Sequence, residues 1–232
     1  MLSFYNNHKE KKLKNIKAVI FDLDGTLLDT IQDLADSCNK TLEQLGMPPR
    51  TLEEVRSFVG NGIARLMEQA VPKGKDNKDF EKSVELMKKN YSSNWHNKTK
   101  PYDGIMDLIS ALKERGIKIG INSNKPDPQV KELARLYFSE VVDETTAVGE
   151  KEGFKRKPFP DLANEIIRIM GVEKEEVVYI GDSEVDVATA RNVGIKCISV
   201  TWGFRSRKLL EENGAKIFAG KPEEILNLIE RL

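Results

Sequence analysis

Four short apolar runs recur along the chain, at residues 17–21 (KAVIF), 117–122 (IKIGIN), 177–181 (VVYIG) and 195–200 (IKCISV). Each run is rich in β-branched residues, is bounded by polar residues or glycine, and shows no alternation of apolar and polar positions. Strands that are buried on both faces of a sheet have this pattern. We therefore predict a strand at each of the four runs.

A different periodicity, that of amphipathic helices, is found between these runs. The segment 104–116 ends at Gly116 and repeats apolar residues at helical spacing, at Ile105, Leu108, Ile109 and Leu112. The segment 161–171 has the same design and also ends at a glycine. Strands that alternate with helices imply a mostly parallel sheet with helices on both faces. The predicted fold class is α/β, with a Rossmann-like three-layer core.

Residues 30–99 break this alternation. They contain helical patterns separated by the turn signals GMPPR, VGNG and VPKGKDNKD, and no convincing strand. An insertion of this length after the first strand is too long for an ordinary crossover. We predict a smaller, all-helical domain at 30–99, inserted into a core formed by 16–29 and 100–232. Residues 1–15 form a basic N-terminal extension that we expect to be frayed.

The charge balance argues against electrostatic partners. The chain has 37 Lys and Arg residues and 37 Asp and Glu residues, so it has no net attraction to nucleic acid or an anionic membrane. No apolar run approaches the ~18 residues of a membrane span, and the N-terminus lacks the apolar core of a signal peptide. We expect a cytoplasmic protein without nucleic-acid or membrane partners, and leave open whether it is a monomer or a homodimer.

Cysteine and histidine chemistry is not expected. Cys38 and Cys197 lie far apart and belong to no CxxC pair, so reduced, buried thiols are the simplest interpretation. The two histidines have no partner at metal-ligand spacing. A histidine metal site and a Ser–His–Asp triad are therefore both disfavoured.

Polar residues follow the ends of three predicted strands. Ligands of open α/β sheets bind beyond the carboxyl ends of the strands. The first strand leads into Asp22, Asp24, Gly25 and Thr26, the second into Ser123, Asn124 and Lys125, and the third into Asp182, Ser183 and Asp186. Lys157 precedes the helix that leads into the third strand. If the strands are parallel neighbours, all these groups converge on one edge.

Each of these fragments also has a purely structural interpretation. DLDGT is consistent with a strand end and a tight turn, and KRKPFPD with a solvated loop. SNKPD and GDSEVD are consistent with N-caps of the helices that follow them. Four such fragments in the order expected of one site nevertheless favour a functional site.

The chemistry of these groups points to phosphoryl transfer. Carboxylates that face one point need a cation, and oxygen ligands without His or Cys favour Mg²⁺. Hydroxyl, lysine and backbone amide groups suit a phosphate. One carboxylate can then act as nucleophile through an aspartyl-phosphate. The second, two residues on, can protonate the leaving oxygen and activate water.

The fragments DLDGT, SNK, KRKPFPD and GDSEVD resemble the four motifs of the haloacid dehalogenase-like phosphatases. The resemblance covers nearly all of the chain after residue 15, and the helical insertion resembles the cap of that superfamily. Within it, VGNGIARLMEQA and TWGFRSRKLLEENGA are similar to phosphoglycolate phosphatases. The resemblance implies a Mg²⁺-dependent phosphatase that acts on a small phosphorylated metabolite, with 2-phosphoglycolate as the leading candidate.

The resemblance also implies a role for individual residues. Asp22 would be the nucleophile and Asp24 the general acid/base, and Mg²⁺ would be held by Asp22, the backbone carbonyl of Asp24, and Asp182. Ser123 and the Asn124 backbone would bind the phosphoryl oxygens.

Two further positions complete this set. Thr26 would lie near Asp24, at the phosphate. Lys157, positioned by Asp186, would neutralise charge in the transition state. Lys151 and Lys155 are nearby rivals, but only Lys157 precedes the proline that the motif requires.

Substrate specificity is expected from the cap, which would close over the site. Asn61 and Arg65 are candidates to face the substrate, and Arg65 would suit a small carboxylate. A solvated helix face is the alternative for both. Trp202 and Arg205 either line the core side of the opening or pack on the last helices.

Other functions remain open at this point. An inorganic pyrophosphatase or a β-phosphoglucomutase would share all four motifs. A phospho-acceptor receiver has similar strand-end residues but needs neither the insertion nor Asp24. A non-catalytic protein that binds a phosphorylated ligand is disfavoured by the intact Asp22, Asp24, Lys157 and Asp182.

Overall fold

The computed structural model describes residues 16–232, so the predicted basic extension lies outside the described residues. The strands are β1 (Ala18–Phe21), β2 (Leu28–Asp29), β3 (Lys100–Pro101), β4 (Lys118–Pro126), β5 (Ala147–Glu150), β6 (Val177–Gly181), β7 (Lys196–Val200) and β8 (Ile217–Ala219). Six of them form one sheet in the order β5-β4-β1-β6-β7-β8, and every neighbouring pair is parallel. The α/β prediction with a mostly parallel sheet is confirmed.

The four predicted strands correspond to β1, β4, β6 and β7. The sequence patterns missed β5 and β8 at the two edges, because AVGE and IFA are too short to stand out as apolar runs. They also missed the small antiparallel pair of β2 and β3. The central three strands of the sheet, β4, β1 and β6, are those that carry the polar strand ends.

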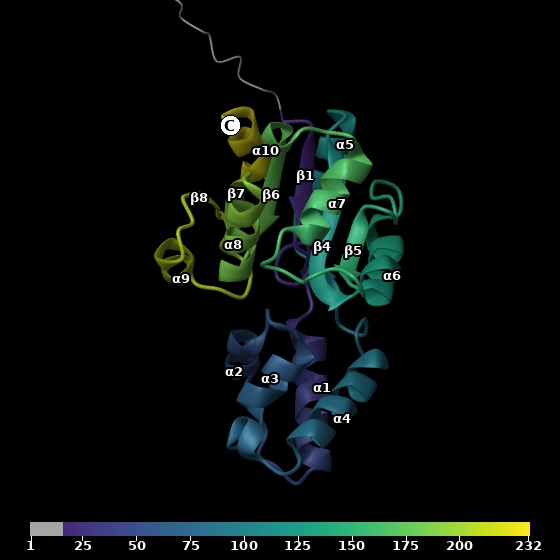
Figure 1. The fold of residues 1–232 in the computed structure, drawn as a ribbon, viewed down its shortest axis with the longest axis vertical. Coiled ribbons are helices and arrows are strands. Elements are labelled where there is room, and N and C mark those ends of the chain that lie inside the picture. Colours follow the sequence, from purple (N-terminus) through teal and green to yellow (C-terminus); the bar gives the residue numbers. More distant parts are fainter. Residues whose placement is uncertain (1–15) are drawn as a thin grey trace, which may run out of the picture.

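Helices cover both faces of the sheet (Figure 1). The core helices are α5 (Ile105–Glu114), α6 (Asp127–Phe138), α7 (Asp161–Met170), α8 (Glu184–Val193), α9 (Arg207–Glu212) and α10 (Glu224–Glu230), with a 3₁₀ turn, η2 (Lys174–Glu176). Ala18 and Ile20 of β1 pack with α7 and α8. Val19 and Phe21 point to the opposite face, into the cluster that includes α5, α6 and α10. Alternate side chains of one strand thus belong to two hydrophobic layers.

The inserted segment contains only helices and turns from residue 30 to residue 99. Its elements are α1 (Ile31–Gln44), α2 (Leu52–Phe58), α3 (Gly62–Ala70), the 3₁₀ turn η1 (Gly74–Asp76) and α4 (Phe80–Ser92). They form a separate group that faces the sheet edge to which the β4 arrow points (Figure 1). Because the sheet is parallel, that edge holds the carboxyl ends of its strands.

Two connections join this helical cap to the core. β2 pairs with β3 at the crossing points, with Leu28 opposite Pro101. The buried carboxylate of Asp33 accepts hydrogen bonds from the backbone N–H groups of Lys98 (2.9 Å) and Thr99 (2.8 Å) and from the Thr99 hydroxyl (2.8 Å). The outgoing and returning segments are therefore held together by strand pairing and by the Asp33 side chain.

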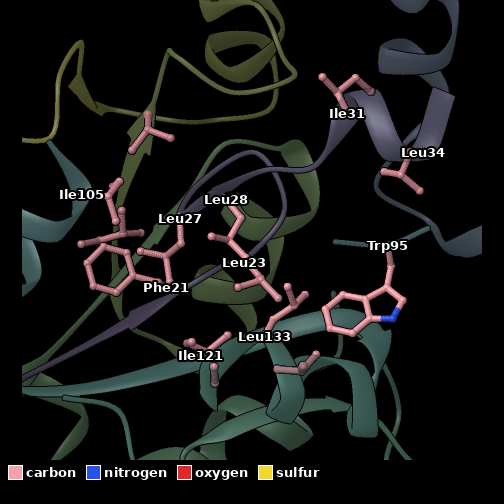
Figure 2. Close-up of a cluster of buried hydrophobic side chains, with 14 of the residues drawn as sticks. Phe21, Leu23, Leu27, Leu28, Ile31, Leu34, Trp95, Ile105, Ile121 and Leu133 are labelled. Atoms are coloured by element: carbon pink, nitrogen blue, oxygen red, sulfur yellow. The ribbon is translucent and has the colours of Figure 1, made fainter. Parts of the chain in front are cut away.

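Hydrophobic packing is continuous through this hinge. One buried cluster includes side chains of the sheet, of the segment that leaves β1, and of the cap. Figure 2 shows part of it, from Phe21 through Leu27 and Leu28 to Leu34 and Trp95. None of the helices in the described part of the chain is long and apolar enough to cross a membrane.

Candidate active site

A cavity of about 260 Å³ lies where the cap meets the carboxyl edge of the sheet. Asp22 follows β1, Ser123 and Asn124 belong to the last part of β4, and Asp182 follows β6. These four residues line the cavity, together with Asp24 and Lys157. Parallel strand ends thus bring together side chains that are up to 160 positions apart in the sequence.

Three buried carboxylates form the floor of the site. Asp22, Asp182 and Asp186 offer oxygen atoms that all lie within 4.8 Å of one another. The Nζ atom of Lys157 lies 2.7 Å from Asp22 Oδ1 and 2.7 Å from Asp186 Oδ1. If all three carboxylates are ionised, one ammonium leaves two negative charges uncompensated. A buried site of this kind needs either a further cation or a proton on one of the carboxylates.

The Asp186 carboxylate is fully occupied by protein donors. Its Oδ1 accepts from Lys157, and its Oδ2 accepts from the Ser183 backbone N–H (3.1 Å) and the Ser183 hydroxyl (2.6 Å). Ser183 is also the N-cap of α8. The capping interpretation of GDSEVD is therefore correct, and the same residues hold Lys157 at the cavity.

Of the three lysines that the sequence offered for this position, only Lys157 reaches the carboxylates. Lys151 lies over the ring of Phe154, with Nζ 4.6 Å from its centroid, and Lys155 lies over the ring of Phe159 at 4.7 Å. Lys157 is 4% exposed. Its burial and its two carboxylate partners make it the cation that pairs with the floor of the site.

Asp182 is held by a hydroxyl and a backbone amide. Its Oδ1 accepts from the Thr26 hydroxyl (3.1 Å) and its Oδ2 from the Phe204 N–H (2.7 Å). Gly25 and Gly203 pack directly against this carboxylate, and a Cβ on either would lie within 2.5 Å of Asp182 atoms. Gly25 also has a φ of +85°, so both its backbone conformation and its closeness to Asp182 favour glycine at this position.

This arrangement differs from the expectation for Thr26. Its hydroxyl contacts Asp182 rather than Asp24, its side chain is fully buried, and it is not among the cavity-lining residues. The N–H groups of Gly25 and Thr26 bond to the carbonyls of Leu28 and Leu23. Neither these amides nor the hydroxyl face a phosphate, because the tight turn after β1 uses them internally.

Two unexpected residues hold Asp24. Its Oδ1 accepts from the Thr30 hydroxyl (2.6 Å) and pairs with the ammonium of Lys125, which is only 7% exposed. The Lys125 ammonium also lies 5.0 Å from the ring centroid of Tyr91 in α4. The sequence had shown Lys125 only as one polar residue of a strand end, and its apolar surroundings were not visible there.

Ser123 and Asn124 both line the cavity. The Ser123 hydroxyl accepts from the Lys125 N–H (3.1 Å). The Asn124 side-chain amide donates to the carbonyls of Gly60 in the cap (3.2 Å) and of Lys157 in the core (3.3 Å). Asn124 therefore connects three parts of the site. The predicted N-cap at SNKPD is absent, because these residues continue β4 and α6 begins at Asp127.

The electrostatics of the floor follow from burial. Burial raises the pKa of Asp22, the neighbouring Asp186 charge adds to this, and Lys157 opposes it. Burial and the Asp186 charge raise the pKa of Asp182 to about 7. Burial alone would lower the pKa of Lys157, but Asp186 and Asp22 raise it well above its usual range.

These residues fit a hard metal ion. The donor atoms are carboxylate oxygens, which hard divalent cations prefer. The excess of two negative charges matches such an ion. Burial first, and repulsion from Asp186 second, raise the pKa values of Asp22 and Asp182, and a bound cation would oppose both effects. Asp22 and Asp182 are the side chains that could hold it, since both line the cavity and Asp186 is not among its lining residues.

Arg65 does not reach the cavity. Its guanidinium pairs with Glu68 in the next turn of α3 (2.8 Å), and its side chain is 52% exposed. Leu66 and Met67 are the residues of this turn that face the interior. Arg65 thus lies on a solvated helix face in this structure. The cations that do line the cavity include Lys88 of α4 and Arg156, and neither has an ion-pair partner among the described residues.

Comparisons with known proteins give a consistent assignment. A family model described as haloacid dehalogenase-like hydrolase matches residues 19–200. The phosphoglycolate phosphatase of Aquifex aeolicus (strain VF5) is 33% identical over 194 residues, which cover 82% of this chain and 86% of that protein. The phosphoglycolate phosphatase of Chromobacterium violaceum is 31% identical over 227 residues, covering 94% of this chain and 98% of that protein.

A solved structure agrees with these relatives. A protein of Lactobacillus delbrueckii subsp. bulgaricus, provisionally assigned as a phosphoglycolate phosphatase, superposes with a TM-score of 0.88 at 34% identity. The alignment covers 93% of this chain and 98% of that chain. Both the sheet and the helical insertion are thus similar to those of a solved relative.

Proposed function

The chain belongs to the haloacid dehalogenase-like hydrolases and is a phosphatase, and from this premise we propose that Mg²⁺ is its metal and 2-phosphoglycolate its substrate. The observation that carries the proposal is the contact of Lys157 with Asp22 at the floor of a small, capped cavity. A carboxylate beside a buried ammonium suits attack on a phosphoryl group, because the ammonium faces the place where negative charge develops.

In the first step Asp22 attacks phosphorus. A bond forms between its carboxylate oxygen and phosphorus, and the bond from phosphorus to the leaving oxygen breaks. Asp24 gives its proton to that oxygen, so the product leaves as an alcohol. Ser123 and the Asn124 backbone bind the phosphoryl oxygens, and Lys157 neutralises their charge. Thr30 and Lys125 both contact Oδ1 of Asp24, so its Oδ2 would carry the proton that is transferred.

In the second step water attacks the phosphorus of the aspartyl-phosphate. Asp24 accepts a proton from this water, the bond between Asp22 and phosphorus breaks, and inorganic phosphate is released. Mg²⁺, held by Asp22, the Asp24 carbonyl and Asp182, would supply the positive charge that lets the phosphoryl group approach the carboxylate. Thr26 holds Asp182 in place and does not touch the phosphate.

The size and charge of the cavity support a small, acidic substrate. A volume of about 260 Å³ is below the usual range of pockets for larger ligands. Lys88 and Arg156 line the cavity and are free to pair with a carboxylate. The names of the curated relatives support the same substrate. We propose these two residues, in place of Arg65, as the carboxylate ligands.

The division of the chain follows the same proposal. Residues 16–29 and 100–232 would form the catalytic core, and residues 30–99 the cap. The helical composition of 30–99 and the paired crossings at β2 and β3 support this division. The unpaired Cys38 and Cys197 support our placement of the enzyme in the cytoplasm, where thiols remain reduced.

The decisive experiment measures phosphate release from 2-phosphoglycolate, pyrophosphate, β-glucose 1-phosphate and 4-nitrophenyl phosphate. Each substrate is tested with Mg²⁺ and with chelator, for the wild type and for Asp22→Asn. We expect a kcat/KM for 2-phosphoglycolate at least about 100-fold above that of the others, lost on chelation and in the variant.

Other outcomes would replace parts of the proposal. Preference for pyrophosphate would make the enzyme a pyrophosphatase, and conversion of β-glucose 1-phosphate to a second sugar phosphate would make it a mutase. Turnover that persists in Asp22→Asn would remove the nucleophile assignment. If Mn²⁺ restored the activity of the chelated enzyme and Mg²⁺ did not, the choice of metal would be overturned.

A further inference from the structure

One arginine of the core contacts the cap directly above the site. Arg205, in the loop between β7 and α9, donates from Nη1 to the carbonyl of Arg56 (3.1 Å) and from Nη2 to the carbonyl of Val59. Its Nε donates to Glu184 Oε2 (3.0 Å) at the start of α8. The side chain is only 9% exposed. One guanidinium therefore makes two hydrogen bonds to the cap and one within the core.

The acceptors on the cap belong to the end of α2 and the turn into α3. Carbonyls at a helix end have no partner within the helix and need donors from elsewhere. Val59 and Gly60 of this turn also line the cavity. The next carbonyl, that of Gly60, accepts from Asn124 of β4. The turn that roofs the cavity is thus attached to the core by its carbonyls.

The backbone of this turn is shaped for the contact. Gly60 has a φ of +121°, and a Cβ at this position would lie 3.2 Å from Arg205 Nη2. A side chain there would be strained by the backbone and would crowd the guanidinium. Glycine therefore lets the arginine reach the carbonyls.

The core side of the contact leads to the carboxylates. The residue before Arg205, Phe204, donates its N–H to Asp182 Oδ2 (2.7 Å). Glu184, the ion-pair partner of Arg205, follows Ser183, the N-cap of α8. The same short loop thus donates a hydrogen bond to Asp182 at the floor of the cavity and two hydrogen bonds to the cap above it.

We propose, on the basis of the phosphatase function proposed above, that Arg205 is a positioning residue that holds the cap closed over a small substrate. Its guanidinium lines the cavity but is committed to three protein acceptors, so it binds the cap and not the substrate. Arginine is suited to this task because its planar fork serves several acceptors at once, whereas lysine offers a single point charge.

The effect of cap closure on kcat/KM should depend on the size of the substrate. A small metabolite such as 2-phosphoglycolate contacts both core and cap only when the cap is closed. A bulky aryl phosphate, whose leaving group extends out of the cavity, is turned over with the cap open and gains little from closure. Loss of Arg205 should therefore change the ratio of the two activities.

The test compares Arg205→Met with Arg207→Met. Arg207 is a matched control, because it lies in the same region, is 61% exposed and pairs with Glu211 on its own helix. We expect Arg205→Met to lower kcat/KM for 2-phosphoglycolate about 30-fold, mainly through KM, and to leave that for 4-nitrophenyl phosphate within about three-fold. Arg205→Lys should recover part of the loss, and Arg207→Met should change neither activity.

Hydrogen exchange gives a readout that needs no turnover. With Mg²⁺ and orthovanadate, amides of residues 56–62 should be protected in the wild type and in Arg207→Met, and much less in Arg205→Met. Amides of β1 and β6 report whether the variant is folded, and they should be unchanged. Arg205→Lys serves the same comparison if Arg205→Met does not fold.

Two results would overturn the assignment. Equal losses for both substrates with unchanged exchange at 56–62 would mean that Arg205 acts on the chemical step. Unchanged activity and exchange would mean that the contact does not hold the cap. If the wild type rejects 2-phosphoglycolate, the proposed substrate fails, and the exchange comparison still tests the cap contact on its own.

Discussion

The carboxyl edge of the sheet and the cap that faces it are built in opposite ways. At the edge, buried side chains carry the chemistry, and Asp22, Asp182 and Asp186 are each at most 7% exposed. On the cap, the groups that meet the core include backbone carbonyls, such as those of Val59 and Gly60. The floor of the site is thus held by contacts between side chains, whereas its roof is attached by hydrogen bonds from core side chains to backbone carbonyls.

This difference explains why the residues at the carboxyl edge of the sheet could be predicted from the sequence, whereas the contacts of the cap could not. A parallel sheet brings its strand ends to one edge, so polar residues after each strand must meet there. A cap contact depends on how a short helix is rotated, and α3 turns Leu66 inward and Arg65 outward. Tertiary packing decides which side of a cap helix faces the core, and no sequence motif marks that side.

The largest expected effect is at the edge, for Lys157→Met. This variant leaves Asp22 and Asp186 buried without their shared ammonium, and removes the charge that we propose faces the transferred phosphoryl group. We expect kcat to fall about 10³-fold and the free energy of unfolding to fall by about 3 kcal/mol. Steady-state kinetics and urea unfolding measure the two effects.

Lys155→Met is the matched control for Lys157→Met. Lys155 lies two positions earlier and covers an exposed aromatic ring, so its loss should leave kcat within about two-fold. A large loss of activity in Lys155→Met together with an active Lys157→Met would reverse the choice between the rival lysines.

The next effect is expected at the hinge between the two regions, for Asp33→Ala. Asp33 is 1% exposed and accepts from two backbone N–H groups and one hydroxyl of the returning segment. Its removal leaves these donors without their acceptor, which should cost about 3 kcal/mol and lower Tm by ~9 °C. Thermal unfolding followed by circular dichroism measures the shift.

Asp36→Ala provides the comparison for the hinge. Asp36 lies one turn along the same helix and pairs with the Lys98 side chain at the surface. Its removal should shift Tm by less than about 2 °C. Equal shifts for the two variants would show that the buried contacts of Asp33 do not hold the hinge.

A third prediction concerns the ionisation of the buried carboxylates at the carboxyl ends of the strands. The pKa of Asp182 is about 7, against an ordinary value of 3.8. Between these values the folded protein keeps a proton that the unfolded chain has lost, so stability without metal must fall as pH rises through this window. The raised pKa of Asp22 acts in the same direction.

Metal should reverse this trend, because it binds the ionised carboxylates. We expect the chelated protein to melt ~5 °C lower at about pH 8 than at about pH 5.5. Mg²⁺ should raise Tm more at the higher pH. A chelated protein that is more stable at about pH 8, or a Mg²⁺ shift that is largest in acid, would contradict the charge excess at the floor.

Much of the architecture was predictable for the same reason as the chemistry. The apolar runs of β1, β4, β6 and β7 are long enough to identify the buried strands, and their order predicts the parallel sheet. The helical insertion was predictable because 70 residues without a strand cannot be a simple crossover. In both cases the signal extends over many residues.

What was missed depends on single contacts. The edge strands β5 and β8 have four and three residues. Thr26 was expected beside Asp24, but the turn after β1 directs its hydroxyl to Asp182. The roles of Thr30 and Lys125 at Asp24, and of Arg205 at the cap, arise from pairings across the chain. No local pattern encodes contacts of this kind.

The smallest effects are expected where the substrate carboxylate would bind, at Lys88 of the cap and Arg156 of the core. Lys88→Met and Arg156→Met should each raise KM for 2-phosphoglycolate about ten-fold with little change in kcat, because pairing with a remote carboxylate is similar in the ground and transition states. The double variant should lose more than either single one. KM for 4-nitrophenyl phosphate, which has no carboxylate, should not change.

Arg65→Met tests whether the rise in KM depends on where the positive charge lies or only on its loss. It also removes one positive charge, but Arg65 is paired with Glu68 at the surface and does not line the cavity. KM for 2-phosphoglycolate should therefore stay within about two-fold of the wild type. A ten-fold rise in KM for Arg65→Met, with Lys88→Met and Arg156→Met unaffected, would restore Arg65 as the carboxylate ligand. It would also mean that the cap turns α3 toward the core when substrate binds.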